Sequence, residues 1–163
     1  MDETPSIDDV RKAYELELLD STGQKVKFGS LIDDTGKTVV VFIRHFFCGS
    51  CQAYVSRLAQ VQDEVLEKTR VKVVVIGCGS YQPIKQYQQK TGFNKPVYAD
   101  ATRALFRHFH LIENLEATSA DQPVKNYLAG RNRLMNVLRS IWTGPLQRPQ
   151  YIGWTGDKTP SFV

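Results

Sequence analysis

An apolar, β-branched run that ends at two closely spaced cysteines constrains the fold of this chain more than any other feature. The run covers residues 37–47, and Cys-Gly-Ser-Cys follows it at positions 48–51. From the second cysteine onward, apolar residues recur at helical spacing as far as about residue 70. The sequence therefore predicts a strand covered on both faces, a tight turn, and one long helix that begins at the cysteines.

Strand-like and helix-like segments alternate along the rest of the chain. A capped helix is predicted over residues 6–14, and two strand-prone pieces within residues 15–28 flank a turn at Ser21–Gln24, which predicts a hairpin. Further strands are predicted at 71–77 and 96–99, and further helices at 81–90, 101–112 and 126–142. Strands joined by helices imply right-handed crossovers, so we expect an α/β fold with a largely parallel sheet in one domain, residues 1–163.

Charge and hydropathy exclude several classes of function. A net charge of +4 with acidic and basic residues interspersed argues against a nucleic-acid binder, which concentrates its basic residues on one face. The longest apolar run, Val39–Ile43, is far short of the ~20 residues that cross a bilayer, and the N-terminus is acidic. Three cysteines are too few for a secreted disulfide scaffold. We therefore expect a soluble, cytoplasmic protein without a metal or another cofactor.

The position of the cysteine pair predicts thiol chemistry. Free N–H groups and the dipole at the start of a helix stabilise a thiolate, and they lower its pKa. Cys48 is expected to be the more exposed and the nucleophilic thiol, while Cys51, one turn inside the helix, can attack an intermediate formed on Cys48. Gly49 and Ser50 are small enough to let the turn tighten and a substrate approach.

Three neighbouring residues are candidate members of the same site. Arg44 and His45 interrupt the apolar run just before the cysteines, where cations would stabilise a thiolate and donors would orient a peroxide or a disulfide. They are also compatible with an ordinary ion pair and a loop histidine. Cys78 follows a second predicted strand at the same carboxyl edge of the sheet, where it is either an auxiliary thiol or a packing residue.

Two other interpretations of the cysteine pair stay open. A structural zinc site needs four ligands, so Cys78 and one of three histidines would have to complete it. These histidines are His45, His108 and His110. Alternatively, the two cysteines are buried thiols without chemistry, because free cysteine often behaves as a small apolar residue.

Four stretches of the sequence together resemble a known family. They are DSTGQKVKFGSLI, VVVFIRHFFCGSCQAYVSRLAQV, VKVVVIGCGS and PVYADATRALFRHFHL. They resemble the peroxiredoxin-like branch of the alkyl hydroperoxide reductase/thiol-specific antioxidant family. The resemblance implies a thioredoxin-like fold with a mixed, mainly parallel central sheet flanked by helices.

The same resemblance implies a thiol-dependent oxidoreductase that reduces peroxides or disulfides. Cys48 would be the nucleophile and Cys51 the resolving thiol, with a thioredoxin- or glutathione-type electron donor. The alternatives are a catalytically degenerate binding scaffold and a non-redox enzyme of a biosynthetic pathway, because fold alone does not fix function.

The sequence departs from the family pattern in two places. Where the family carries Pro-x-x-x-Thr-x-x-Cys, this chain has Val41 and His45, so the hydroxyl that would hold a peroxide is missing. At the C-terminus, the two-stranded piece and final helix of the family are expected to be missing or incomplete, and Pro160 is the candidate for the cis-proline that faces the cysteines. An incomplete sheet edge invites pairing with another chain, so a homodimer is expected.

Overall fold

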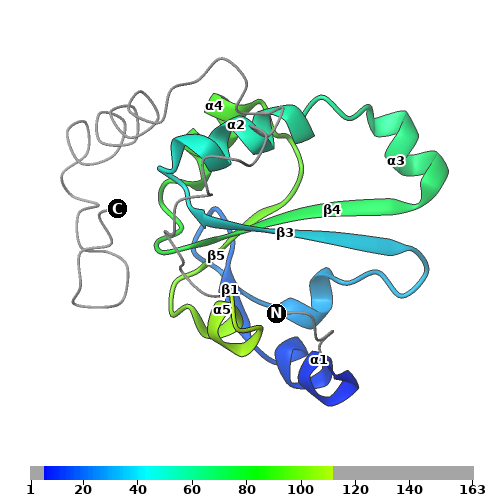
Figure 1. Cartoon of the computed structure of the whole chain (residues 1–163), viewed down its shortest axis with the longest axis vertical. Coiled ribbons are helices and arrows are strands. Elements are labelled where there is room, and N and C mark those ends of the chain that lie inside the picture. The colour runs from blue at the N-terminus through cyan, green and yellow to red at the C-terminus, as the bar shows by residue number, and fades with distance from the viewer. Residues whose placement is uncertain (1–5, 112–163) are drawn as a thin grey trace, which may run out of the picture.

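The computed structural model describes residues 6–111, which contain all three cysteines (Figure 1). The predicted helix at 126–142, the expected C-terminal hairpin and Pro160 lie outside the described residues. Within 6–111, no helix combines the length and apolar character needed to cross a bilayer.

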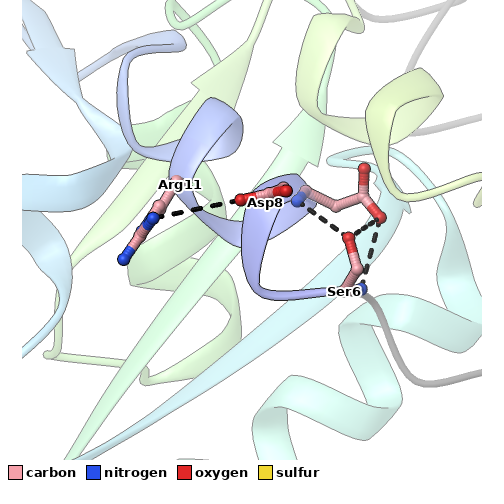
Figure 2. Close-up of polar contacts among 4 residues, drawn as sticks. Ser6, Asp8 and Arg11 are labelled. Carbon is pink, nitrogen blue, oxygen red and sulfur yellow. Dashed lines mark hydrogen bonds and ion pairs between the residues drawn. The ribbon is translucent and has the colours of Figure 1, made fainter.

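The N-terminal helix and hairpin form as the sequence predicts. Helix α1 (Ile7–Tyr14) begins with a capping box, in which the hydroxyl of Ser6 accepts the N–H of Asp9 at 3.1 Å and the Asp9 carboxylate accepts the N–H of Ser6 at 3.2 Å (Figure 2). The hairpin pairs β1 (Glu17–Leu19) with β2 (Lys25–Lys27) in antiparallel register.

A five-stranded mixed sheet runs in the order β2-β1-β5-β4-β3. Strand β4 (Val71–Cys78) pairs in parallel with β3 (Lys37–His45) on one side and with β5 (Val97–Asp100) on the other. Strand β1 joins β5 in antiparallel direction, so the hairpin extends a parallel three-stranded centre. The predicted α/β class and mixed sheet are confirmed.

Helices cover both faces of the sheet (Figure 1). Helices α2 (Gly49–Leu58) and α4 (Ile84–Thr91) lie on one face, while α1, the 3₁₀ helix η1 (Phe28–Leu31) and the short α5 (Ala104–His108) lie on the other. Each face has its own apolar cluster, and alternate residues of β4 serve one cluster or the other.

The predicted long helix after the cysteines is two helices. The first begins at Gly49, at the cysteines as predicted, and ends at Leu58; a separate helix α3 (Asp63–Thr69) follows. Tight i→i−3 bonds from Gln60 and Val61 close the first helix, and the extended backbone of Gln62 starts the second. The prediction of one continuous helix was wrong because apolar residues at helical spacing continue across a break that no glycine or proline marks.

The strand before the cysteines packs on both faces as predicted, with Val41 and Ile43 in one apolar cluster and Val40 and Phe42 against the other, but it is not a central strand. Among residues 6–111, β3 has a single neighbouring strand and is an edge of the sheet. Ile43 is its one buried residue, and Val39 is 46% exposed. The central strand is β4, which is buried from Val73 to Cys78 and whose Val74, Val75 and Ile76 have no exposed surface.

Candidate active site

Cys48 is the N-cap residue of α2 and places its sulfur at the start of that helix. Its backbone is extended (φ −67°, ψ 116°), and its Sγ accepts the backbone N–H of Cys51 with a sulfur–nitrogen distance of 3.5 Å. The backbone oxygen of Cys48 accepts the N–H of Gln52 at 2.9 Å, which is the first bond of the helix. A sulfur therefore occupies the place that a serine or aspartate oxygen fills in most helix caps.

The surroundings of the two thiols drive their pKa values apart. A hydrogen bond from the Cys51 thiol lowers the pKa of Cys48 to about 6, helped by the Cys51 N–H, the charge of Arg44 and the Ser50 N–H, and opposed by burial. The same hydrogen bond, burial and the neighbouring Cys48 charge raise the pKa of Cys51. At neutral pH the pair is therefore one thiolate, on Cys48, and one thiol, on Cys51.

The expectation that Cys48 is the more exposed cysteine was wrong. Cys48 is buried, with 7% of its surface exposed, whereas Cys51 is intermediate. The reason is the cap itself, because the sulfur folds back over the first turn of α2 to reach the N–H of Cys51. The nucleophile predicted from the sequence is thus charged but narrowly accessible.

A β-bulge brings Arg44 into the site. Ile43 pairs with Gly77 and His45 pairs with Cys78, so the register shifts at Arg44, which is the extra residue of the bulge. The backbone N–H of Arg44 reaches the sulfur of Cys51, where it acts to lower that thiol's pKa. The side chain of Arg44 is exposed, and its charge favours a thiolate on either cysteine.

His45 cannot supply the positive charge that the sequence suggested. Burial, and then the charge of Arg44, lower the pKa of His45 to about 4, so its imidazole is neutral at pH 7. At neutral pH the side-chain charge that favours the Cys48 thiolate is therefore that of Arg44 and not that of His45.

Sequence reasoning missed the buried polar residues behind the cysteines. The side-chain amide of Gln52 donates to the backbone oxygen of Phe46 at 2.9 Å, and the Tyr87 hydroxyl donates to that of Cys51 at 3.4 Å. The rings of Phe46 and Tyr87 meet edge to face with centroids 5.4 Å apart. A tyrosine in an apolar helix stripe needs a partner for its hydroxyl, and that signal could have pointed to a polar neighbour.

Not all predicted residues come together. Gly49 is buried and Ser50 half-buried in the turn between the cysteines, as their size allows. Cys78 packs with the cluster on the opposite face of the sheet from α2, as does the helix that carries His108. Among residues 6–111, no three His, Cys, Asp or Glu side chains are grouped so as to hold a metal ion.

A parallel β3–β4–β5 centre with a Cys-x-x-Cys at the start of the following helix defines a thioredoxin-like domain. The helices on both faces and the added hairpin agree with that class. The chain belongs to the AhpC/TSA family, whose sequence model matches residues 10–134. The resemblance seen in the sequence is thereby confirmed.

Named relatives match most of this chain. Peroxiredoxin-like 2C of Mus musculus is 36% identical over 137 residues, which are 81% of this chain and 58% of that protein. The thioredoxin-like protein AAED1, chloroplastic, of Arabidopsis thaliana is 29% identical over 119 residues, 71% of this chain and 47% of that protein. The chain thus spans less than two thirds of the length of these relatives.

Solved structures share the fold at low sequence identity. The Xanthomonas campestris bacterioferritin comigratory protein superposes with a TM-score of 0.54 at 20% identity, over 68% of this chain and 65% of that one. A Mycobacterium tuberculosis disulfide oxidoreductase gives a TM-score of 0.50 at 17% identity, over 63% and 73%. At these identities the likeness concerns the fold.

Proposed function

We propose that this protein is a thiol-dependent oxidoreductase that cycles Cys48 and Cys51 between dithiol and disulfide. The observation that carries the proposal is the sulfur of Cys48 held at the start of α2, with donors from the N–H and thiol of Cys51. These contacts stabilise the anionic nucleophile before any substrate arrives.

The proposed reaction with a disulfide has two displacements. The Cys48 thiolate attacks one substrate sulfur, the substrate S–S bond breaks, and the first substrate thiolate leaves. Cys51 then loses its proton and attacks the sulfur of Cys48, releasing the second substrate thiolate and forming the Cys48–Cys51 disulfide. Two electrons pass to the substrate, and a thioredoxin- or glutathione-type thiol donor returns them.

Arg44 has a defined role in the second displacement. Once Cys48 is bonded to the substrate it no longer carries charge, so its opposition to ionising Cys51 disappears. The backbone N–H and the charge of Arg44, which both favour the Cys51 thiolate, remain in place. The bulge therefore supports the resolving step.

Peroxide is the second candidate substrate, and membership of the AhpC/TSA family favours it. The Cys48 thiolate would attack a peroxide oxygen and release an alcohol or water, and Cys51 would displace hydroxide from the resulting sulfenic acid. Against efficient peroxide reduction, Val41 and neutral His45 stand where the family has its proline and threonine. Disulfide exchange needs no such hydroxyl, and we place it first.

Assembly and location stay predictions. A homodimer through the edge of β3 is supported by that strand having one partner among residues 6–111. Sedimentation as a monomer at micromolar concentration would contradict it. The cytoplasmic location is untested, and the name of the Arabidopsis relative places that protein in the chloroplast.

Trapping the intermediate tests the function. The Cys51→Ser variant is treated with mild peroxide or with a small aromatic disulfide, and the adduct on Cys48 is read by mass spectrometry of peptides. A mixed disulfide without sulfenic acid identifies a disulfide reductase, whereas an accumulating sulfenic acid identifies a peroxidase. If neither adduct forms and Cys48→Ser leaves function in cells intact, the chain is a binding scaffold.

A further inference from the structure

A cleft lies between α1 and α5, on the face of the sheet opposite the cysteine pair. Its volume is about 490 Å³. The lining is dominated by basic side chains from the two helices and from the residue just after α5: Lys12, Arg107, His108 and His110. None of these residues has a part in the proposed redox reaction.

The acidic group in the cleft keeps its negative charge, because hydrogen bonds from Ser6 lower the pKa of Asp9. Asp9 is the one acidic residue of the lining, and its carboxylate accepts both the hydroxyl of Ser6, at 2.6 Å, and the N–H of Ser6 (Figure 2). In contrast, no ion pair within residues 6–111 involves Lys12 or Arg107. The charge of Lys12 does act on the Asp9 carboxylate, whose pKa it helps to lower, so the cleft carries two cations, Lys12 and Arg107, against one carboxylate.

A hydrogen bond between the two helices fixes the width of the cleft. Nε2 of His108 lies 2.6 Å from the backbone oxygen of Asp9, and since a carbonyl only accepts, Nε2 carries the proton. The ring of His108 is thereby held in the wall, and α5 is tied to α1.

The backbone of His110 is the feature that calls for an explanation. It is left-handed, with φ +50°, and the bonds from His110 N to Arg107 O (3.0 Å) and from Leu111 N to Phe106 O (2.9 Å) end α5 as a Schellman motif. Glycine takes that position without steric cost, whereas histidine does not. This turn brings the imidazole of His110 to the rim of the cleft.

We propose that this cleft binds a small phosphate monoester, with the phosphate on Lys12, Arg107 and His110. Arginine matches phosphate oxygens with a planar fork and lysine adds a point charge, so two cations and an imidazole suit a dianion. Leu16 and Ala104 form an apolar part of the lining, which would pack against the organic group. The proposal is independent of the redox function.

Phenyl phosphate and inorganic phosphate are the probes that test it. Each is titrated into the full chain and followed by amide chemical shifts and by calorimetry. Saturable binding of phenyl phosphate, with shifts confined to α1 and α5 and with weaker binding of inorganic phosphate, is expected. Equal affinity for the two probes would overturn the assignment to a monoester, and the absence of saturable binding would overturn the site.

Variants separate binding from stability. The double change Lys12→Gln and Arg107→Gln, at exposed positions, is expected to weaken phenyl phosphate binding about tenfold or more. His110→Gly is expected to weaken binding and, because it relieves the backbone, to raise the unfolding temperature.

Arg70→Gly is the matched control. Arg70 has the same left-handed backbone, with φ 51° at the end of α3, so its replacement raises the unfolding temperature but leaves phosphate binding unchanged. Wild-type affinity in His110→Gly would overturn the role of that residue. The alkylation rate of Cys48 is expected to be the same in all these variants, so a failure here is distinct from a failure of the redox proposal.

Discussion

The sulfur of Cys48 and the backbone nitrogen of Cys51 lie 3.5 Å apart, with the N–H donating to the sulfur. This contact makes the nucleophile part of the helix, since the group that ionises is also the group that caps α2. Negative charge on the sulfur faces the positive end of the helix dipole. The thiolate therefore stabilises α2, and the folded helix in turn stabilises the thiolate, which is the reactive form.

The pH dependence of alkylation tests this contact. With a pKa of about 6, Cys48 is half ionised near pH 6, where an ordinary thiol is almost fully protonated. Allowing for the lower nucleophilicity of a more acidic thiol, we expect iodoacetamide to react about tenfold faster with Cys48 than with a free thiol at pH 6. Peptide mapping at a series of pH values measures the midpoint, and a midpoint above pH 8 would contradict the assignment.

Removing the Cys51 thiol should raise the pKa of Cys48. The hydrogen bond from Cys51 is the largest cause of the lowered pKa, and Cys51→Ala deletes it while the N–H contact remains. The alkylation midpoint of this variant is expected to move to higher pH. Cys51→Ser is the matched control, because its hydroxyl can still donate a hydrogen bond to Cys48. Its alkylation midpoint should lie between those of the wild-type protein and Cys51→Ala.

Arg44→Gln should also raise the pKa of Cys48, by a smaller amount. The Arg44 side chain is exposed, so solvent screens its charge, and an effect of about 0.2–1 kcal/mol corresponds to a loss of at most about threefold in the ionised fraction of Cys48, and so in rate, at pH 6. Added salt should reduce the difference. Arg57→Gln, in the last turn of α2, is the control and should leave the rate unchanged.

His45 should make stability depend on pH in the acidic range. Its pKa is about 4 in the folded protein and 6.5 as the ordinary value, so the unfolded chain binds the proton more readily. The contribution of His45 to the free energy of unfolding is fully present above pH 6.5 and is lost as the pH falls toward 4. The loss is no more than about 3 kcal/mol. Urea unfolding at pH 7 and pH 4.5 measures the change; His45→Gln should flatten it, and an equal slope in both proteins would contradict the prediction.

Asp100 is expected to be the main anchor of α5. Its buried carboxylate accepts the N–H groups of Ala104, Leu105 and Phe106 at 3.0, 2.9 and 3.1 Å. Asp100→Ala leaves these donors without their acceptor and should destabilise the fold by about 1–3 kcal/mol. Asp100→Asn keeps one acceptor oxygen, so it should lower the free energy of unfolding by less than Asp100→Ala does. Urea unfolding of the two variants measures the difference, and equal destabilisation would contradict a role for the carboxylate oxygens as acceptors.

The sequence predicts the fold well where local signals and tertiary contacts agree. The Ser6 cap and the hairpin turn each act within a few residues, and each is found where expected. The cysteines at a helix start follow from the same local logic. The family resemblance adds the prediction of a mixed sheet. The alternation of strands and helices along the chain predicts only the parallel part of that sheet.

The rest depends on contacts that a single sequence does not contain. Val61 and Val65, which extended the predicted helix across its break, are 36% and 48% exposed, so their spacing reflected no buried face. The covering of Cys48 results from a sulfur turned back onto its own helix. Tyr87 reaches the site from 36 residues away, through packing that only the tertiary structure shows.

Because of the bulge at Arg44, the number of residues in β3 decides which way the following side chains point, as much as the identity of those residues does. Ile43 and Phe46, three positions apart, pack into the same cluster, although strict alternation would send them to opposite faces. The extra residue of the bulge changes which face of the sheet each following side chain points to, just before the cysteines. Deleting one residue there is expected to move Phe46 out of the apolar cluster that it shares with Ile43.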